Sequence, residues 1–470
     1  ISLHEKTIGE KPAKIDELPS SGSNRRYFRL SGAKSFIGVI GTVKEENEAF
    51  IYFDRHFRER GIPVPEVVAI SDDRMAYLQQ DLGDTLLFNA IEKGRKTRVF
   101  SDHERDLLIK TIRQLPDIQF NGAVGLDFSK CYPAAEFDTR SIMWDLNYFK
   151  YCFLKATGLE FQEDLLEDDF QAMAEVLMRS SSSTFMYRDF QSRNVMILDS
   201  KPWFIDFQGG RKGPFYYDVA SFLWQAKANM TDSLRRELID EYIDALRRYK
   251  PVDEEYFHEQ LRHFVLFRIL QVLGAYGFRG YFEKKPHFIQ SVPYAIENLR
   301  NLLREPYPEY PYLSRLLRDL VDMKQFSDEL EKRTLTVKVM SFAYKKGIPN
   351  DTTGNGGGFI FDCRAVNNPG KYERYKPFTG LDEPVIAFLE NDGEITEFLS
   401  HCNALVDASV RRYIERGFSN LMVAFGCTGG QHRSVYCAQH LAERLNREFG
   451  IKVELVHREQ NIEQLFKAKR

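Results

Sequence analysis

Two absences in this 470-residue sequence argue against a membrane protein and a secreted protein. The most apolar stretch, FVLFRILQVLGAYGF from Phe264, contains Arg268 and is too short to span a bilayer. The opening residues, ISLHEKTIGE, lack the apolar core of a secretory signal. We therefore expect no membrane partner, and we predict that the stretch from Phe264 is a buried helix.

The cysteine spacing and the net charge argue against further classes of protein. Six cysteines occur without a C-x-x-C pair or dense spacing, which disfavours a disulfide framework or a zinc site and fits a reducing cytoplasm. The formal net charge of -3 gives no overall signal for nucleic acid or membrane. With 43% hydrophobic and 28% charged residues, the chain is typical of globular proteins.

The length is too great for one hydrophobic core and predicts two or three domains. Strand-like runs from Tyr27 to Leu78 are interrupted by one helical stretch, EENEAFIYFDRHFRERG. A mostly helical region follows, and a new β-rich region begins at TLTVKVMSFAYKKG. The predicted domains are 1–87, 88–332 and 333–470, with the second boundary near Lys332 to Thr334.

The stretch YRDFQSRNVMILDSKPWFIDFQGG, from Tyr187 to Gly210, carries the most chemistry. Asp189 and Asn194 are five residues apart, a hydrophobic strand follows, and Asp206 comes twelve residues after Asn194. Phosphoryl transfer needs a carboxylate to accept the proton of the attacking hydroxyl, and oxygen ligands for Mg²⁺. This spacing supplies all three groups, although a polar turn between two strands is the structural alternative.

Residues 20–320 resemble the aminoglycoside phosphotransferase and choline kinase group, and are most similar to AmgK-like cell-wall sugar kinases. The segments that carry the resemblance are SGSNRRYFRL, YLQQDLGD, WDLNYFKYCFL and DFQGGRKGPFYYDVAS. The resemblance implies an α+β protein-kinase-like bilobal fold, ATP and Mg²⁺, Asp189 as catalytic base, and Asn194 and Asp206 as metal ligands. It also implies that Ser21, Gly22, Ser23 and Asn24 cover the phosphates and that Gln80, Asp81 and Leu82 bind adenine.

Two features depart from that group. Tyr187 stands where the group has a His two residues before the catalytic Asp. The strand FIGVIG, Phe36 to Gly41, lacks the Lys that pairs with the α- and β-phosphates. The substitute candidates are Arg26, Arg29 and Lys44 for the cation, and Glu46 and Glu48 for its partner on the helix.

Two further carboxylates follow from the same segments. By resemblance, Asp145 lies in the substrate region. For Asp218, we expect a supporting role, as a helix cap or a brace of the catalytic loop, in preference to substrate contact.

The second phosphate motif is GCTGGQHRS, Gly426 to Ser434. It follows the buried-strand pattern NLMVAFG and precedes an amphipathic helix, so free backbone N–H groups at the helix start predict an anion site. Arg433 would add a bidentate clamp. The spacing C-x5-R-S is also that of cysteine phosphatases, in which Cys427 would be the thiolate nucleophile and Arg433 would bind the phosphoryl oxygens.

Residues 335–470 resemble the C-terminal domain of RapZ, on the segments SFAYKKGIPNDT, FDCRAVNNPG, PFTGLDEPV and GCTGGQHRSV. The resemblance implies an α/β domain that binds phosphate or phosphosugar. Gly370 replaces a His of that family, no G-x-x-x-x-G-K-S/T motif occurs, and the thin basic tail argues against RNA binding. The expected contacts are Asp362, Arg364, Cys427, Thr428, Gly429, Gly430, His432 and Arg433.

Together these patterns predict a cytoplasmic ATP-dependent sugar kinase, with a C-terminal phosphosugar-binding regulatory domain. The expected acceptor is the anomeric hydroxyl of an amino sugar such as N-acetylmuramate or N-acetylglucosamine. Two alternatives stay open: a non-catalytic kinase-like adaptor with a ligand- or RNA-binding domain, and a phosphatase that uses Cys427 and Arg433.

Overall fold

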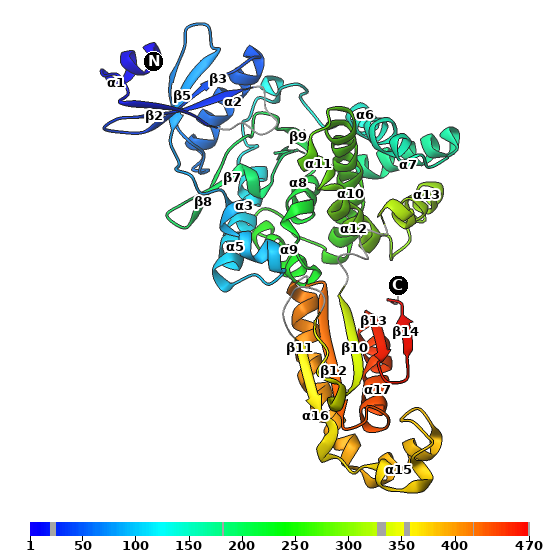
Figure 1. Ribbon diagram of the computed structural model, residues 1–470. Coiled ribbons are helices and arrows are strands. Elements are labelled where there is room, and N and C mark those ends of the chain that lie inside the picture. The colour runs from blue at the N-terminus through cyan, green and yellow to red at the C-terminus, as the bar shows by residue number, and fades with distance from the viewer. Residues whose placement is uncertain (19–24, 181–182, 327–334, 352–357, 417, 469–470) are drawn as a thin grey trace. The chain divides into compact units, whose positions relative to one another are not determined.

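A computed structural model describes residues 1–18, 25–180, 183–326, 335–351, 358–416 and 418–468. The chain forms two compact units, Ile1–Phe326 and Ser327–Arg470 (Figure 1). The domain boundary expected near Lys332 to Thr334 lies outside the described residues.

The first unit begins with a five-stranded antiparallel sheet in the order β1-β2-β3-β5-β4, drawn in blue in Figure 1. On helix α2, Phe50, Phe53 and Phe57 recur at helical spacing and are buried, as the sequence predicts. The elements of this part are α1 (Ser2–Ile8), β1 (Lys14–Leu18), β2 (Arg26–Ser31), β3 (Phe36–Ile40), α2 (Lys44–Glu59), β4 (Val67–Ile70) and β5 (Ala76–Gln80).

Helices dominate the remainder of the first unit. The central one is α10 (Glu254–Tyr276), which contacts α6, α8 and α12 and is buried around most of its circumference from Phe264 to Leu273, as predicted. Among the described residues, no helix is both long and apolar enough to cross a membrane. The other helices are α3 (Leu87–Ala90), α4 (Glu92–Thr97), α5 (Asp102–Pro116), α6 (Thr139–Phe149), α7 (Glu163–Arg179), α8 (Tyr216–Leu223), α9 (Asp232–Leu246), α11 (Pro286–Ile289), α12 (Val292–Leu302) and α13 (Pro311–Asp322).

Two small antiparallel ribbons interrupt these helices. Strand β6 (Thr184–Met186) pairs with β9 (Arg211–Gly213), and β7 (Val195–Leu198) pairs with β8 (Lys201–Phe204). The stretch that carries Asp189, Asn194 and Asp206 runs from the end of β6, through β7 and β8, to the start of β9. All three side chains therefore extend from one short, hydrogen-bonded segment.

The second unit is an α/β fold with the strand order β11-β12-β10-β13-β14, of which the first four strands are parallel. The connection from β10 to β11 passes β12, and the connection from β12 to β13 passes β10, so both connections cross at the two central strands. The elements are β10 (Thr336–Ala343), β11 (Gly358–Asp362), α15 (Glu383–Asp392), α16 (Glu394–Arg416), β12 (Asn420–Cys427), α17 (Arg433–Phe449), β13 (Lys452–His457) and β14 (Ile462–Phe466).

Candidate functional site

The loop that carries Asp189 is held by a buried carboxylate beneath it. Asp218 of α8 accepts hydrogen bonds from the backbone N–H groups of Tyr187 and Arg188, each at 2.9 Å, and from the Gln119 amide at 3.1 Å. Burial raises the pKa of Asp218 to about 7. Both carboxylate oxygens of Asp218 therefore accept hydrogen bonds that hold the loop, and Asp218 serves neither as a helix cap nor as a substrate contact.

Tyr187 connects this loop to the segment that precedes Asp206. Its buried hydroxyl donates to the backbone oxygen of Ile205 at 2.5 Å, and its ring packs edge-on against Phe190 and Phe207. The tyrosine that replaces the expected His therefore braces the same loop by a different hydrogen bond.

The three chemistry-bearing side chains of the first unit come together. The Asn194 amide donates to the Asp189 backbone oxygen at 2.8 Å, and the Ile205 N–H donates to the Asn194 backbone oxygen at 3.1 Å, which places Asp206 next to both. Burial raises the pKa of Asp206; a hydrogen bond from Gln208 opposes this, and the charge of Asp189 adds to it.

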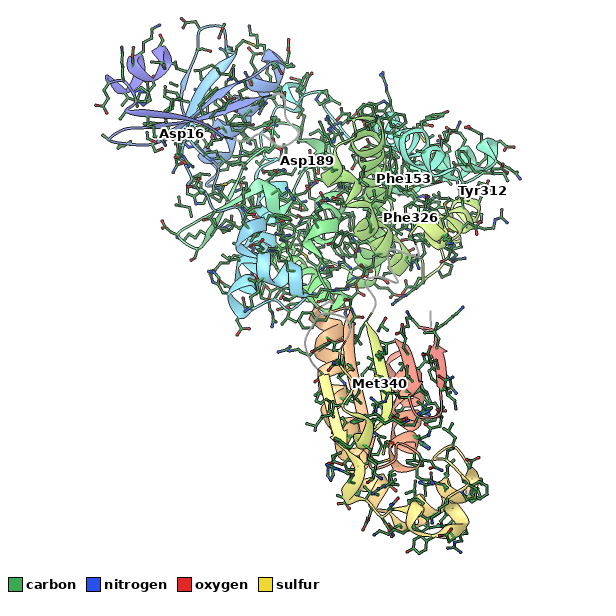
Figure 2. All side chains as sticks on the ribbon, in the orientation of Figure 1. Asp16, Phe153, Asp189, Tyr312, Phe326 and Met340 are labelled. Atoms are coloured by element: carbon green, nitrogen blue, oxygen red, sulfur yellow. The ribbon has the colours of Figure 1, made fainter. Side chains whose placement is uncertain are left out.

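These groups stand where two cavities meet. Asn194 and Asp206 line a cavity of about 360 Å³ beside the antiparallel sheet, and Asp189 lines a second one of about 700 Å³ among the helices. Arg193 lines both cavities. Figure 2 shows Asp189 where the sheet and the helical part of the first unit adjoin.

The donor set fits a divalent ion. Asn194 and Asp206 offer an amide oxygen and a carboxylate to one cavity, and oxygen ligands are what Mg²⁺ prefers. Burial is the main cause of the raised pKa of Asp206, and a bound cation would favour the ionised form of this carboxylate. Within the described ranges, no cluster of three or more His, Cys, Asp or Glu side chains is found, and the remaining ligands would be phosphate oxygens and water.

The smaller cavity also contains Gln80, Asp81 and Leu82 at the end of β5. The Asp81 carboxylate accepts hydrogen bonds from Arg29 at 2.7 Å and from Ser35 at 2.6 Å. Although burial raises the pKa of Asp81, these two bonds outweigh it and lower the pKa. Asp81 thus fixes the turn, while Ser21, Gly22, Ser23 and Asn24 lie outside the described residues.

A buried cation missed in the sequence occupies the smaller cavity. Arg25 is 2% exposed, lines the cavity and forms an ion pair of 3.1 Å with Glu46 of α2. The Gln208 amide donates to Asp206 at 2.7 Å and reaches Glu46 at 3.5 Å. A continuous polar network therefore joins Arg25 to the carboxylate of Asp206.

Of the cations suggested by the sequence, Arg29 lines the same cavity, where it pairs with Asp81 at 2.7 Å. Arg26 pairs with Glu17 at 2.9 Å on the exposed side of β2, and Lys44 is exposed at the start of α2. Because successive side chains of a strand point to opposite faces, Arg25 and Arg29 share one face and Arg26 lies on the other. This alternation is a sequence signal that separates Arg25 and Arg29 from Arg26.

The larger cavity combines aromatic and charged groups. Trp144 and Tyr148 stack with ring centroids 6.1 Å apart and line it together with Asp145. Gln271 donates to Asp145 at 2.9 Å, and burial raises the pKa of Asp145. Arg268 lies 3.8 Å from a carboxylate oxygen of Asp189. The cavity thus offers hydrogen-bonding groups beside flat apolar surfaces.

In the second unit, the motif GCTGGQHRS lies at the carboxyl end of β12 and the start of α17. The Cys427 sulfur accepts the Gly430 N–H at 3.2 Å and lies 3.2 Å from the Ser434 hydroxyl. Burial acts to raise the Cys427 pKa, but these hydrogen bonds and the charge of Arg433 lower it. Gly430 has a φ of 66°, and a Cβ there would lie 2.8 Å from the Ala343 nitrogen, which favours glycine.

The other predicted anion contacts gather at the same edge but bond largely to protein. Arg433 Nη1 donates to the backbone oxygens of Arg364 at 3.0 Å and Val366 at 2.6 Å. The His432 ring is 3.1 Å from the Tyr375 oxygen. The Arg364 side chain pairs with Asp362 at 2.6 Å. Thr428 and Gly429 are exposed, and Arg433 Nε has no hydrogen-bond partner among the described residues.

Two protein-family models match the chain. The model described as the phosphotransferase enzyme family matches residues 14–252, about half of the chain. The chain belongs to this family. The RapZ C-terminal domain matches residues 335–461 of the phosphotransferase. The protein-kinase-like fold of the first unit and the RapZ C-terminal domain of the second are thus confirmed.

Two curated relatives match a little more than a quarter of the chain. A nucleotide-binding protein of Staphylococcus epidermidis is 42% identical over 130 residues, which cover 28% of this chain and 41% of the relative. One from Fervidobacterium nodosum is 37% identical over 130 residues, covering 27% and 44%. The chain spans less than half the length of these relatives.

Solved structures similar to the phosphotransferase match its first unit. An aminoglycoside 2″-phosphotransferase in complex with GDP and kanamycin is 13% identical with a TM-score of 0.46, over 64% of this chain and 98% of that one. A choline kinase from Streptococcus pneumoniae is 14% identical with a TM-score of 0.43, over 64% and 98%.

Proposed function

We propose that this phosphotransferase is an ATP- and Mg²⁺-dependent sugar kinase whose second unit binds a phosphosugar and regulates the first. The observation that carries the proposal is the position of the Asp189 loop between two cavities. The smaller cavity would hold the nucleotide, and the larger would hold the acceptor. Because ATP is supplied in the cytoplasm, we place the enzyme there.

Asp189 would act as the general base. A carboxylate that accepts the proton of the attacking hydroxyl contributes by position as much as by basicity. Asn194 anchors its backbone, and Arg268 approaches its side chain from the acceptor cavity. These contacts would aim Asp189 at a hydroxyl bound in the larger cavity.

Asn194 and Asp206 would hold Mg²⁺, which when bound neutralises charge on the transferring phosphoryl group. Arg25 would take the place of the absent strand Lys beside the nucleotide phosphates. Its ion pair with Glu46 fixes the guanidinium, and Gln208 connects that pair to Asp206. This network argues against the alternative of a kinase-like adaptor with a degenerate nucleotide site.

The wall of the larger cavity supports a sugar acceptor. Trp144 and Tyr148 offer apolar faces to the C–H side of a sugar ring, and Asp145 and Gln271 offer hydrogen-bonding groups to its hydroxyls. The choice of an amino sugar such as N-acetylmuramate or N-acetylglucosamine, and of its anomeric hydroxyl, rests on the sequence resemblance.

The C-terminal loop supports anion binding more than phosphatase chemistry. Its place between the end of β12 and the start of α17 and its exposed Thr428 and Gly429 suit a phosphate, and the buried Arg433 Nε has no hydrogen-bond partner among the described residues. The Arg433 Nη1 that a phosphatase would turn to its substrate is bonded to backbone oxygens. We expect no hydrolysis of p-nitrophenyl phosphate by the wild type or by Cys427→Ser.

The test is transfer of labelled phosphate from γ-labelled ATP to a panel that contains N-acetylmuramate, N-acetylglucosamine and other sugars. We expect Mg²⁺-dependent labelling of a sugar. If no member of the panel is labelled, the kinase proposal fails. If Mg-ATP also leaves the melting temperature unchanged, the adaptor alternative gains support.

A further inference from the structure

A group of basic side chains gathers around Phe88 at one wall of the larger cavity. The guanidinium carbons of Arg95 and Arg193 lie 3.5 and 4.0 Å from the centroid of the Phe88 ring. Arg95 donates to the backbone oxygen of Lys227 at 3.3 Å, and Lys227 Nζ donates to the backbone oxygen of His287 at 3.1 Å. Arg95, Arg193 and Lys227 are called the basic cluster below.

The basic cluster has no acidic partner within the part of the chain that the structure describes. None of its three members forms an ion pair there, and the hydrogen bonds of Arg95 and Lys227 go to backbone oxygens. Glu92, the nearest acidic neighbour of Arg95 in sequence, pairs with Lys96 at 2.8 Å. Burial lowers the pKa of Lys227, and the charges of Arg193 and Arg95 lower it further.

Apart from the basic cluster, the acidic and basic side chains that line the larger cavity are equal in number. Two acidic side chains, Asp145 and Asp189, line the cavity, and Arg188 and Arg268 lie close enough to affect their charge. Arg193 and Lys227 line it in addition, so four basic groups face two acidic ones, a formal excess of two positive charges. Like charges held together in a partly buried site repel each other, and an anionic ligand relieves that cost.

The position of the cluster indicates which ligand carries the anion. Arg193 comes four residues after Asp189 in the catalytic loop and lines both cavities, so it alone would be compatible with a nucleotide phosphate. Lys227 and His287 line only the larger cavity. The unbalanced charge therefore extends along the acceptor side, away from the nucleotide side.

We propose that the acceptor bears an acidic group, a carboxylate or a phosphate, which Arg193 and Lys227 bind while Asp189 addresses the reacting hydroxyl. This inference rests on the proposed kinase function, because it assigns the larger cavity to the acceptor. A cavity with this charge disfavours cationic acceptors, since they would meet uncompensated positive charge. The basic cluster is then a specificity site for acidic sugars.

The experiment compares acceptor pairs that differ only in charge, by calorimetric dissociation constants on the full chain. The probes are N-acetylmuramate and its carboxamide for a carboxylate, and glucose 6-phosphate and glucose for a phosphate. For at least one pair the acidic member should bind roughly tenfold or more tightly, since charge-assisted hydrogen bonds exceed neutral ones. Which pair responds identifies the acid.

Variants assign the effect to the cluster. Lys227→Met should bring the dissociation constants of the acidic and neutral members within about twofold of each other, and Lys227→Arg should restore most of the difference. Arg193→Gln should act in the same direction. The matched control is Lys110→Gln on α5, whose lysine is paired with Asp106 outside both cavities and should keep the wild-type ratio. Melting temperatures verify that each variant is folded.

The outcomes separate this inference from the kinase proposal. Equal binding of acidic and neutral members in the wild type, or an acid preference that survives in Lys227→Met, overturns the inference even if a sugar is phosphorylated. An acid preference that depends on Lys227, without phosphate transfer to any sugar, supports the anion site and contradicts the kinase proposal. If Lys227→Met weakens ATP in place of the acidic sugar, the cluster belongs to the nucleotide and the inference is wrong.

Discussion

The Asp189 loop of the first unit and the Gly-rich loop of the second both contain charged side chains. The two loops differ in which residues hold their backbone. In the first, Asp218 and Tyr187 hold the backbone from below, which leaves Asp189 to line a cavity. In the second, His432 and Arg433 approach or bond backbone oxygens themselves. In the first loop, other residues brace the backbone and Asp189 lines a cavity; in the second, Arg433 itself braces the backbone.

The largest effect is expected from Asp189→Asn. Loss of a general base typically lowers the rate by about 10²- to 10⁴-fold, so kcat should fall in that range while ATP affinity changes little. Steady-state kinetics with the best sugar of the panel measure both quantities. Asp199→Asn, at the exposed turn between β7 and β8, is the control and should behave as the wild type. Comparable activity of Asp189→Asn would remove Asp189 from the chemistry.

The second effect concerns the buried cation. Arg25→Met should weaken Mg-ATP binding or lower kcat by roughly 10- to 100-fold, because a charge-assisted contact to phosphate is lost. Arg25→Lys should recover part of it, since it keeps the charge without the planar fork. The neighbour Arg26, which pairs with Glu17 on the exposed side, provides the control Arg26→Met. Equal losses in the two methionine variants would contradict the assignment.

The third effect tests the bracing role of Arg433. Arg433→Gln should destabilise the second unit by about 1–3 kcal/mol, because the buried backbone oxygen of Val366 and the partly buried one of Arg364 lose their donor. Denaturant unfolding measures this. Arg364→Gln removes an exposed pair with Asp362 and a contact of the guanidinium with the Tyr344 ring, and should cost at most about 1 kcal/mol. If Arg433→Gln left stability unchanged, Arg433 would not brace the loop, and its side chain would be available to a ligand, as we propose for Asp189.

The smallest effect is a pH dependence of the second unit. Burial lowers the pKa of His457 to about 4, and its ring nitrogens lie 2.9 Å from Ser341 and 3.0 Å from Gln439. Below the ordinary histidine pKa of about 6.5 the unfolded chain takes up a proton that the folded chain does not. Stability should therefore fall as pH drops from about 6.5 toward 4.

His457→Gln should flatten this pH dependence, by roughly 1–3 kcal/mol over that window. The exposed His401 supplies the control His401→Gln, which should keep the wild-type slope. Unfolding curves of the second unit at several pH values measure it. A slope that is the same in His457→Gln and the wild type would show that other groups cause the pH dependence.

Periodicity and spacing predicted much of the fold and part of the site. The phenylalanines of α2 and the apolar run of α10 mark buried helices because burial imposes the helical period. Asp189, Asn194 and Asp206 are close in sequence, so one loop and one ribbon bring them together. Strand β1, KIDEL, carries too many charged residues to be recognised as a strand by hydrophobicity.

Groups that meet only through tertiary structure could not be predicted. Arg25 reaches Glu46 only after β2 and α2 have packed together. Arg193 and Lys227 are distant in sequence from each other and from Phe88 and Arg95, so no spacing rule connects them. For Arg433, the sequence motif indicated the residue type, but the direction of its hydrogen bonds depends on the segment of residues 364–366.

The most direct test of the central claim is a crystal structure with a non-hydrolysable ATP analogue, Mg²⁺ and an acceptor sugar such as N-acetylmuramate. We predict that the terminal phosphate lies beside Asn194 and Asp206, with a sugar hydroxyl within about 3.5 Å of the Asp189 carboxylate. A nucleotide whose phosphates lie outside that cavity, or a sugar whose hydroxyls all point away from Asp189, would contradict it.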